Sequence, residues 1–426
     1  MLHPVNVGQK SLTDYATILG RGLVAEIQRL SERVDGKRVL HPSATAFGGG
    51  VAEINYTLVP LMRSIGLDVE WRIIRGEDEF FNVTKKIHNA LQGSPVGLMP
   101  EEEEIFHRYN ALNAEELDES EYDFIIIHDP QPAAMIDHFA ARQARWIWRC
   151  HIDLSEPNAE VLEFLRPMIA AHDAAVFHRR AYAPQADGLP PAYIWPPAID
   201  PLNPKNMALS PEDAAYIVDQ FGIDVDRPLV SQISRFDPWK DPVGVIGAWR
   251  LMRDRHPRAQ LALVGSMAHD DPEGWEYYNQ TVEAAEGDPD IFILSNLNNV
   301  GSVEVNAFQV HSSVCVQKSI REGFGLTVTE ALWKGKPVVA GRVGGIVDQI
   351  QDGETGFLVD SVEQCAEACA LVLDDPAHAR AMALRGKEYV RGHFLMPRLL
   401  RDWLALFNRL AGNETGDTDL VTAGAA

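Results

Sequence analysis

Short apolar runs alternate along most of the chain with longer segments whose apolar residues recur every three or four positions. The short runs predict buried strands, and the longer segments predict amphipathic helices. Buried-type strands that alternate with helices indicate parallel sheets covered by helices on both faces. We therefore expect an α/β protein with doubly wound sheets.

The strands fall into two series on either side of a proline-rich segment, residues 195–201. We expect strands at residues 37–44, 68–74, 122–128, 145–152, 174–177 and 192–195, and then at 228–233, 260–264, 291–294, 314–317, 337–340 and 356–359. The proline-rich segment cannot continue a helix or a central strand, so we interpret it as a linker.

Two Rossmann-like domains follow from this pattern, an N-terminal one over residues 1–197 and a C-terminal one over residues 198–397. Ligands of such sheets bind at the carboxyl ends of the strands, so we expect a cleft between two facing domains. An amphipathic segment, residues 398–412, is expected to form a C-terminal helix that crosses back onto the first domain. Residues 413–426 are expected to be disordered.

Composition and charge exclude several classes of binding partner. Among 426 residues, 46% are hydrophobic and 23% charged, the balance of a soluble globular protein. The formal net charge of −23 argues against nucleic acids and anionic membranes. No uncharged apolar run is long enough to span a bilayer, and the first ten residues lack the pattern of a signal peptide. The four cysteines lack metal-ligand spacing, which fits a reducing cytoplasm. Positive potential at an anion site must therefore come from a few basic residues and helix N-termini.

The strongest motif is the segment Arg321–Glu330, REGFGLTVTE. Its glycines open a turn after a strand, and a helix is predicted to begin near Leu326. Free amides at a helix start bind anions. Glu322 in the turn and Glu330, placed about two turns into the helix, suit sugar and ribose hydroxyls, which donate hydrogen bonds to carboxylates. The glycines alone would fit any helix start, but the two glutamates at this spacing favour a ligand site.

Arg235 and Lys240 follow the first strand of the second series. Two basic side chains on a loop at the carboxyl end of a sheet can clamp a pyrophosphate. Isolated residues of this kind are more often solvated surface charges. In so acidic a chain we favour contact with a ligand.

The first domain offers a glycine run and a histidine. Gly48, Gly49 and Gly50 follow the first strand, but Glu53 occupies the last glycine position of a dinucleotide fingerprint. We expect a loop whose amides contact phosphate or sugar; a plain mobile connection is the alternative. His151 and Asp153 follow an apolar strand and are expected to enter the cleft, whereas His128 is interpreted as structural.

These motifs together resemble the retaining glycosyltransferases of family 4, which have the GT-B fold of two facing Rossmann-like domains. More narrowly, the chain resembles trehalose synthases of the glycosyltransferring type, which join NDP-glucose to free glucose. The narrower resemblance rests on His41–Glu53, on Trp148–Ser155 and on the loop with Arg235 and Lys240. It extends from about Val39 to the last helix.

The resemblance implies a role for each matching residue. Arg235 and Lys240 would bind the diphosphate, Glu322 the hydroxyls of the donor glucose, and Glu330 the ribose. The amides of Gly323, Phe324, Gly325 and Leu326 would contact sugar and phosphate. His151 would contact the transferred glucose near its 6-hydroxyl, and Asp153 is assigned to the acceptor side. Some relatives carry aspartate in place of Glu322, and both residue types occur in such sites.

The expected reaction is a transfer with retention by same-face attack, assisted by the leaving phosphate. Fixed cations would balance the diphosphate, so neither a metal nor another cofactor is expected, and we find no D-x-D pair suited to magnesium. A trehalose phosphorylase of the same fold, a nicotinamide-dependent oxidoreductase and a catalytically silent nucleotide-sugar-binding protein are the alternatives. The expected partners are a sugar nucleotide and glucose, without nucleic acid or membrane. The sequence does not indicate the preferred base of the nucleotide. It also leaves the oligomeric state open between a monomer and a homodimer.

Overall fold

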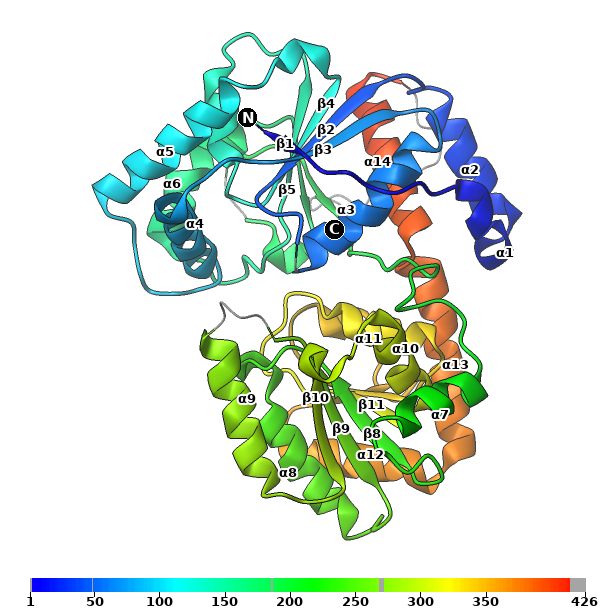
Figure 1. Cartoon of the computed structure of the whole chain (residues 1–426). Coiled ribbons are helices and arrows are strands. Elements are labelled where there is room, and N and C mark those ends of the chain that lie inside the picture. Colours follow the sequence, from blue (N-terminus) through cyan, green and yellow to red (C-terminus); the bar gives the residue numbers. More distant parts are fainter. Residues whose placement is uncertain (1, 48, 185–186, 268–271, 414–426) are drawn as a thin grey trace. The chain divides into compact units, whose positions relative to one another are not determined.

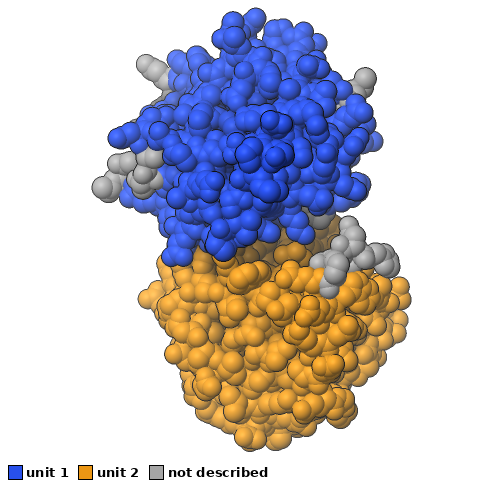
Figure 2. Space-filling view, turned by 90° about the vertical axis from the view of Figure 1, so that its left-hand side faces the viewer, with its two compact units in different colours: residues 1–197, 396–426 blue, residues 198–395 orange. Residues whose placement is uncertain are grey.

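The computed structural model describes residues 2–47, 49–184, 187–267 and 272–413 (Figure 1). The chain divides into two compact units, coloured separately in Figure 2. Unit 1 comprises Met1–Pro197 together with Met396–Ala426, and unit 2 comprises Ala198–Leu395. Each unit has an α/β architecture with one central sheet.

The described part of unit 1 forms a seven-stranded sheet in the order β1-β3-β2-β4-β5-β6-β7. Its strands are β1 His3–Pro4, β2 Arg38–Ser43, β3 Asp68–Ile73, β4 Phe124–His128, β5 Arg145–Arg149, β6 Ala174–Phe177 and β7 Ala192–Ile194. From β3 to β7 all neighbours are parallel, as predicted. The expectation of a wholly parallel sheet is wrong at one edge, where β1 pairs antiparallel with β3. Two residues are too few to carry an alternation pattern, so the sequence did not indicate β1.

Helices cover both faces of this sheet. Their bounds are α1 Ala16–Leu19, α2 Arg21–Ser31, α3 Gly49–Arg63, α4 Asp78–Leu91, α5 Pro100–Ala114, α6 Ala159–Ala170 and α14 Met396–Leu410. Figure 1 shows α4, α5 and α6 on one side and α2, α3 and α14 on the other. The strand β4 is buried throughout because it faces both layers: Ile125 and Ile127 join the core under α4–α6, whereas the ring of Phe124 stacks on Phe407 of α14 at 4.4 Å.

The described part of unit 2 forms a six-stranded parallel sheet in the order β10-β9-β8-β11-β12-β13. The strands are β8 Leu229–Ile233, β9 Gln260–Gly265, β10 Ile291–Ser295, β11 Val314–Gln317, β12 Val338–Gly341 and β13 Phe357–Val359. The helices are α7 Pro211–Asp219, α8 Pro242–Arg253, α9 Pro272–Ala285, α10 Ser302–His311, α11 Leu326–Trp333, α12 Val362–Asp374 and α13 Pro376–His393. Apolar residues of α8 and α12 fill the core on one face, and residues of α7 and α10 fill it on the other.

The helix α14 packs into unit 1 although it follows unit 2 in the sequence. Its Asn408 side chain donates a hydrogen bond of 2.9 Å to the Leu30 carbonyl of α2. Arg398 forms a buried ion pair of 2.6 Å with Asp402 and donates to the Pro196 carbonyl at 2.7 Å. In the part of the chain that the structure describes, no helix is long and apolar enough to cross a membrane.

Candidate functional site

The helix α11 starts at Leu326, where the motif of two glutamates predicted a helix start. Gly325 precedes it with φ of 86°, a left-handed conformation that favours glycine. The first amides of the helix have no partner within it and are therefore available to an anion. Glu330 lies four residues after Leu326, so it stands about one turn into the helix. The prediction that it lies two turns into the helix is wrong.

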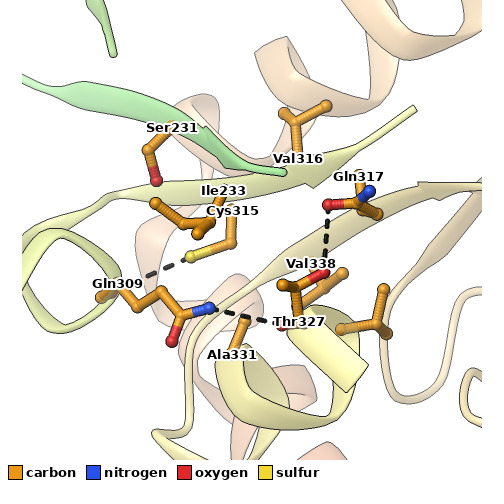
Figure 3. A pocket seen from close by; sticks show the side chains of 10 residues that line it. Ser231, Ile233, Gln309, Cys315, Val316, Gln317, Thr327, Ala331 and Val338 are labelled. Atoms are coloured by element: carbon orange, nitrogen blue, oxygen red, sulfur yellow. Dashed lines mark hydrogen bonds between the residues drawn. The ribbon is translucent and has the colours of Figure 1, made fainter. Parts of the chain in front are cut away.

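Side chains behind α11 hold its first turn on the sheet (Figure 3). The hydroxyl of Thr327 donates to the Gln317 side chain of β11 at 3.1 Å, and the Gln309 amide of α10 donates to the Thr327 carbonyl at 3.3 Å. A small cavity between them is lined by apolar groups of β11, β12 and α11, together with Ser231 and Cys315. The amides at the start of α11 are thus fixed in place before any ligand binds.

Lys240 and Glu322 form an ion pair although 82 residues separate them. Nζ of Lys240 lies 2.5 Å from Oε2 of Glu322, and the hydroxyl of Ser319 donates to the same oxygen at 3.3 Å. Lys240 ends a short 3-10 helix after β8, and its backbone N–H donates to the Asp237 carboxylate at 3.1 Å. The fold therefore brings together two predicted site residues that the sequence had placed in separate motifs.

Arg235 lies beside the same turn and is largely exposed. Its guanidinium is 3.2 Å from the Asp237 carboxylate, and 70% of its side chain is accessible. Burial raises the pKa of Asp237, while the charges of Lys240 and Arg235 act in the opposite direction. Arg235 is anchored at one end of the turn and can reach an anion in solvent.

Glu330 is almost completely buried and contacts a residue that the sequence analysis did not identify. Nζ of Lys205 lies 3.3 Å from Oε1 of Glu330, whose side chain is 1% exposed. The neighbouring Asn206 accepts hydrogen bonds from Trp333 at 3.3 Å and Lys334 at 3.0 Å, so this segment is fastened to α11. Lys205 follows the linker without any recognisable motif, and no signal in the sequence pointed to it.

The glycine run of unit 1 is more helical than expected. Gly48 lies outside the described residues. Gly49, with φ of 78°, and Gly50 are the first residues of α3, so the prediction that they form a loop is wrong. Glycine is tolerated here because a first turn has few hydrogen bonds to lose, and its amides stay available to a ligand.

His151 lies two residues after β5 and is held on three sides. Its ring contacts His128 at 2.9 Å and His178 at 3.4 Å, and its backbone N–H donates to the Asp129 carboxylate at 2.6 Å. Burial lowers the pKa of His151 well below the usual value, and Arg149 adds to this effect. His128 was interpreted as merely structural, but it is a direct partner of the predicted site residue.

Asp153 caps the turn that follows. Its carboxylate accepts the Ser155 N–H at 2.8 Å, and the side chain remains partly exposed. The predicted site residues thus form two groups, one at the carboxyl edge of each sheet. A single cleft that unites the two groups stays a prediction.

Comparisons with known proteins agree with this architecture. Residues 41–184 match the family model "Trehalose synthase, N-terminal domain", and residues 215–389 match "Glycosyl transferases group 1". A trehalose synthase of Rubrobacter xylanophilus is 57% identical over 97% of this chain and 100% of its own length. A trehalose phosphorylase of Pleurotus pulmonarius is 27% identical over 90% of this chain and 58% of its own.

A solved structure shows the same fold. The α,α-trehalose 6-phosphate synthase of Burkholderia multivorans superposes with a TM-score of 0.67 at 16% identity, over 88% of this chain and 99% of that one. The two sheets, parallel except for the edge strand β1, and this likeness confirm the predicted α/β fold of the GT-B class. Because a relative of such high identity matches along its whole length, this chain belongs to the trehalose synthase family of glycosyltransferases.

Proposed function

We propose that the protein transfers glucose from a nucleoside diphosphate glucose to free glucose and forms trehalose with retention of configuration. The observation that carries this proposal is the 57% identity to a trehalose synthase over the full length of that relative. The arrangement of basic residues and helix amides in unit 2 supports a nucleoside diphosphate as the leaving group.

The leaving diphosphate gains negative charge as the bond to the sugar breaks. Lys240 and Arg235 supply positive charge beside the turn after β8, and the first amides of α11 supply oriented dipoles. Groups fixed before the reaction stabilise such charge without reorganisation. We propose that they suffice without a metal ion.

The two glutamates take different parts of the donor in this proposal. Glu322 would accept hydrogen bonds from hydroxyls of the transferred glucose, and its ion pair with Lys240 holds its carboxylate next to the proposed position of the leaving group. Glu330 would accept the ribose hydroxyls. Its contact with Lys205 holds the carboxylate in place within the buried start of α11.

The residues of unit 1 are assigned to the sugars. His151 would contact the transferred glucose near its 6-hydroxyl, and Asp153 would face the acceptor. The amides of Gly49 and Gly50 at the start of α3 would contact phosphate or sugar. We propose attack on the same face as departure, with the leaving phosphate as the base, because no carboxylate is assigned as a nucleophile.

A matrix of donors and acceptors tests the proposal. ADP-glucose and UDP-glucose are each combined with glucose, with glucose 6-phosphate and with no acceptor, and the product is analysed for composition and anomeric configuration. We expect α,α-trehalose from free glucose with at least one donor. A further mixture contains trehalose and inorganic phosphate without a nucleotide, and turnover in that mixture alone would replace the proposal with the phosphorylase alternative.

A variant pair connects the activity to the site. Lys240→Met should lose most of the transfer, whereas Arg391→Met, a change of the same type on the exposed surface of α13, should retain it.

A further inference from the structure

Gln232 is a buried glutamine near the carboxyl end of β8, with 1% of the residue exposed. Its strand pairs in parallel with β11, where Gln232 stands opposite Val316. The turn after β8 carries Lys240, and the turn after β11 carries Glu322. Gln232 therefore lies beside the starts of both turns.

The side-chain amide of Gln232 contacts the backbone of both turns. Its Oε1 accepts the N–H of Lys318 at 2.9 Å, and its Nε2 donates to the carbonyl of Lys240 at 2.9 Å. A backbone N–H can only donate and a carbonyl can only accept, so both contacts fit a single orientation of the amide. An ionised carboxylate of the same length could make one of these hydrogen bonds, and an apolar side chain could make neither.

The turns are also joined just before Lys240 in the sequence. The N–H of Ile320 donates to the Trp239 carbonyl at 2.8 Å. The guanidinium of Arg321 lies 5.3 Å from the centre of the Trp239 ring, which is 46% exposed. These contacts lie at the surface, whereas the contacts of Gln232 are buried.

Asp241, the residue after Lys240, has a strained backbone. Its φ of 48° lies in the left-handed region, which residues other than glycine seldom adopt. Its carboxylate accepts the N–H of Gly244 at 3.0 Å and forms an ion pair with Nζ of the largely buried Lys318. Such strain persists where surrounding contacts determine the conformation, and it concentrates at functional sites. The turn of Lys240 is thus held in one conformation by contacts with the turn after β11.

The backbone of Lys240 is fixed on both sides. Its N–H donates to the Asp237 carboxylate at 3.1 Å, and its carbonyl accepts from Gln232. A lysine side chain is a flexible stem of four carbons, so the reach of its ammonium depends on where the backbone is held. From this anchored backbone, Nζ of Lys240 lies 2.5 Å from Oε2 of Glu322.

We infer that Gln232 is a positioning residue, which ties the turn of Lys240 to the turn of Glu322 and thereby sets the ammonium next to the carboxylate. The identity of the ligand, a diphosphate that leaves a sugar, rests on the proposed function, but the contacts of Gln232 do not. Charges that are fixed in place stabilise a leaving group without reorganisation, and a small displacement loses much of the effect.

Gln260 supplies a matched control for Gln232. It is also 1% exposed, its Oε1 accepts the N–H of Asp224 at 3.0 Å, and its Nε2 donates to the Asp224 carbonyl at 2.8 Å. It begins β9 and so lies at the opposite edge of the sheet from the two turns. Gln232→Met and Gln260→Met therefore each remove two buried hydrogen bonds to the backbone, but only the first removes them from the site.

The first measurement needs no ligand. The coupling between Lys240→Met and Glu322→Gln is determined by urea unfolding of the full chain, with and without Gln232→Met. We expect Gln232→Met to reduce the coupling free energy by at least half, because the two turns are no longer tied. Gln260→Met should leave the coupling unchanged.

The second measurement is the transfer reaction with ADP-glucose or UDP-glucose and glucose. Gln232→Met should lower kcat about tenfold, roughly the effect of one hydrogen bond, with little change in KM. Gln260→Met should keep kcat within about twofold of the parent chain, because it loses stability without moving the site. If Gln232→Met does not fold, Gln232→Glu replaces it in both measurements, since it keeps the size of the side chain and lacks the donor to Lys240.

Each outcome decides a different point. An unchanged coupling in the folded Gln232 variant would overturn the positioning role, and so would an equal loss of kcat in Gln260→Met. A reduced coupling in a protein that transfers no glucose would refute the proposed function and leave the positioning role of Gln232 intact.

Discussion

The ion pair between Lys240 and Glu322 should contribute to folding as well as to catalysis. Its atoms lie 2.5 Å apart, and the two side chains are only 15% and 11% exposed. Lys240→Met removes the ammonium, keeps much of the length of the side chain and leaves Glu322 without this cation. Breaking a buried ion pair costs about 3–5 kcal/mol. We expect about 3 kcal/mol here because neither side chain is completely buried.

A double-mutant cycle with Glu322→Gln isolates this pair. Urea unfolding of the two single variants and the double variant should give a coupling free energy of about 1–3 kcal/mol. Arg391→Met is the control: its pair with Glu388 is 43% and 62% exposed, so we expect a loss below about 1 kcal/mol. In the transfer assay, Lys240→Met should reduce kcat about 100- to 1,000-fold. If the losses in free energy of unfolding of the two single variants add up to the loss of the double variant within about 0.5 kcal/mol, the two residues are not coupled and the reasoning is refuted.

Three further predictions concern ligands and pH. Glu330→Gln should weaken the binding of free NDP measured by calorimetry, whereas Glu322→Gln should mainly lower kcat; equal weakening of NDP binding would contradict this division. EDTA should leave the transfer rate nearly unchanged, and a complete loss that a divalent ion restores would overturn the metal-free mechanism. Burial lowers the pKa values of His41, His128, His151 and His178, so these rings stay neutral in the folded protein but take up protons on unfolding. Unit 1 should therefore lose stability as pH falls below about 6.5, by more than about 1.4 kcal/mol per pH unit. Burial raises the pKa of Asp129 to about 7, so this carboxyl releases a proton on unfolding and offsets the uptake by one histidine. The measurement is urea unfolding between pH 5 and 8, and a free energy of unfolding that shows no such slope would refute the prediction.

The order of the main elements was predictable because buried strands have a strong local signal. Strands such as Phe124–His128 and Val314–Gln317 are short apolar runs, and both were found where the sequence placed them. The antiparallel strand His3–Pro4 was missed because its pairing with β3 depends on contacts far along the chain. The start of α3 within the glycine run was missed because glycine has low helix propensity that tertiary packing overrides.

The residues of the candidate site were predictable singly, but most of their contacts were not. The motifs named Lys240 and Glu322, yet only the fold shows that they pair. Lys205 reaches Glu330 from a segment without a pattern. The contact between His41 and His128 depends on the order of strands in the sheet, which places β2 next to β4 although β3 lies between them in the sequence.

Because α14 belongs to unit 1 but is synthesised last, the two units need not fold in the order in which they are synthesised. Unit 1 begins first, but its core includes Trp403 and Phe407, which are made only after the whole of unit 2. At ordinary rates of translation, unit 1 waits roughly 10 to 40 seconds between Pro197 and the end of α14. During that interval the ring of Phe124 lacks its stacking partner. On the ribosome, unit 2 is therefore expected to fold first and the N-terminal half to be the part that chaperones protect.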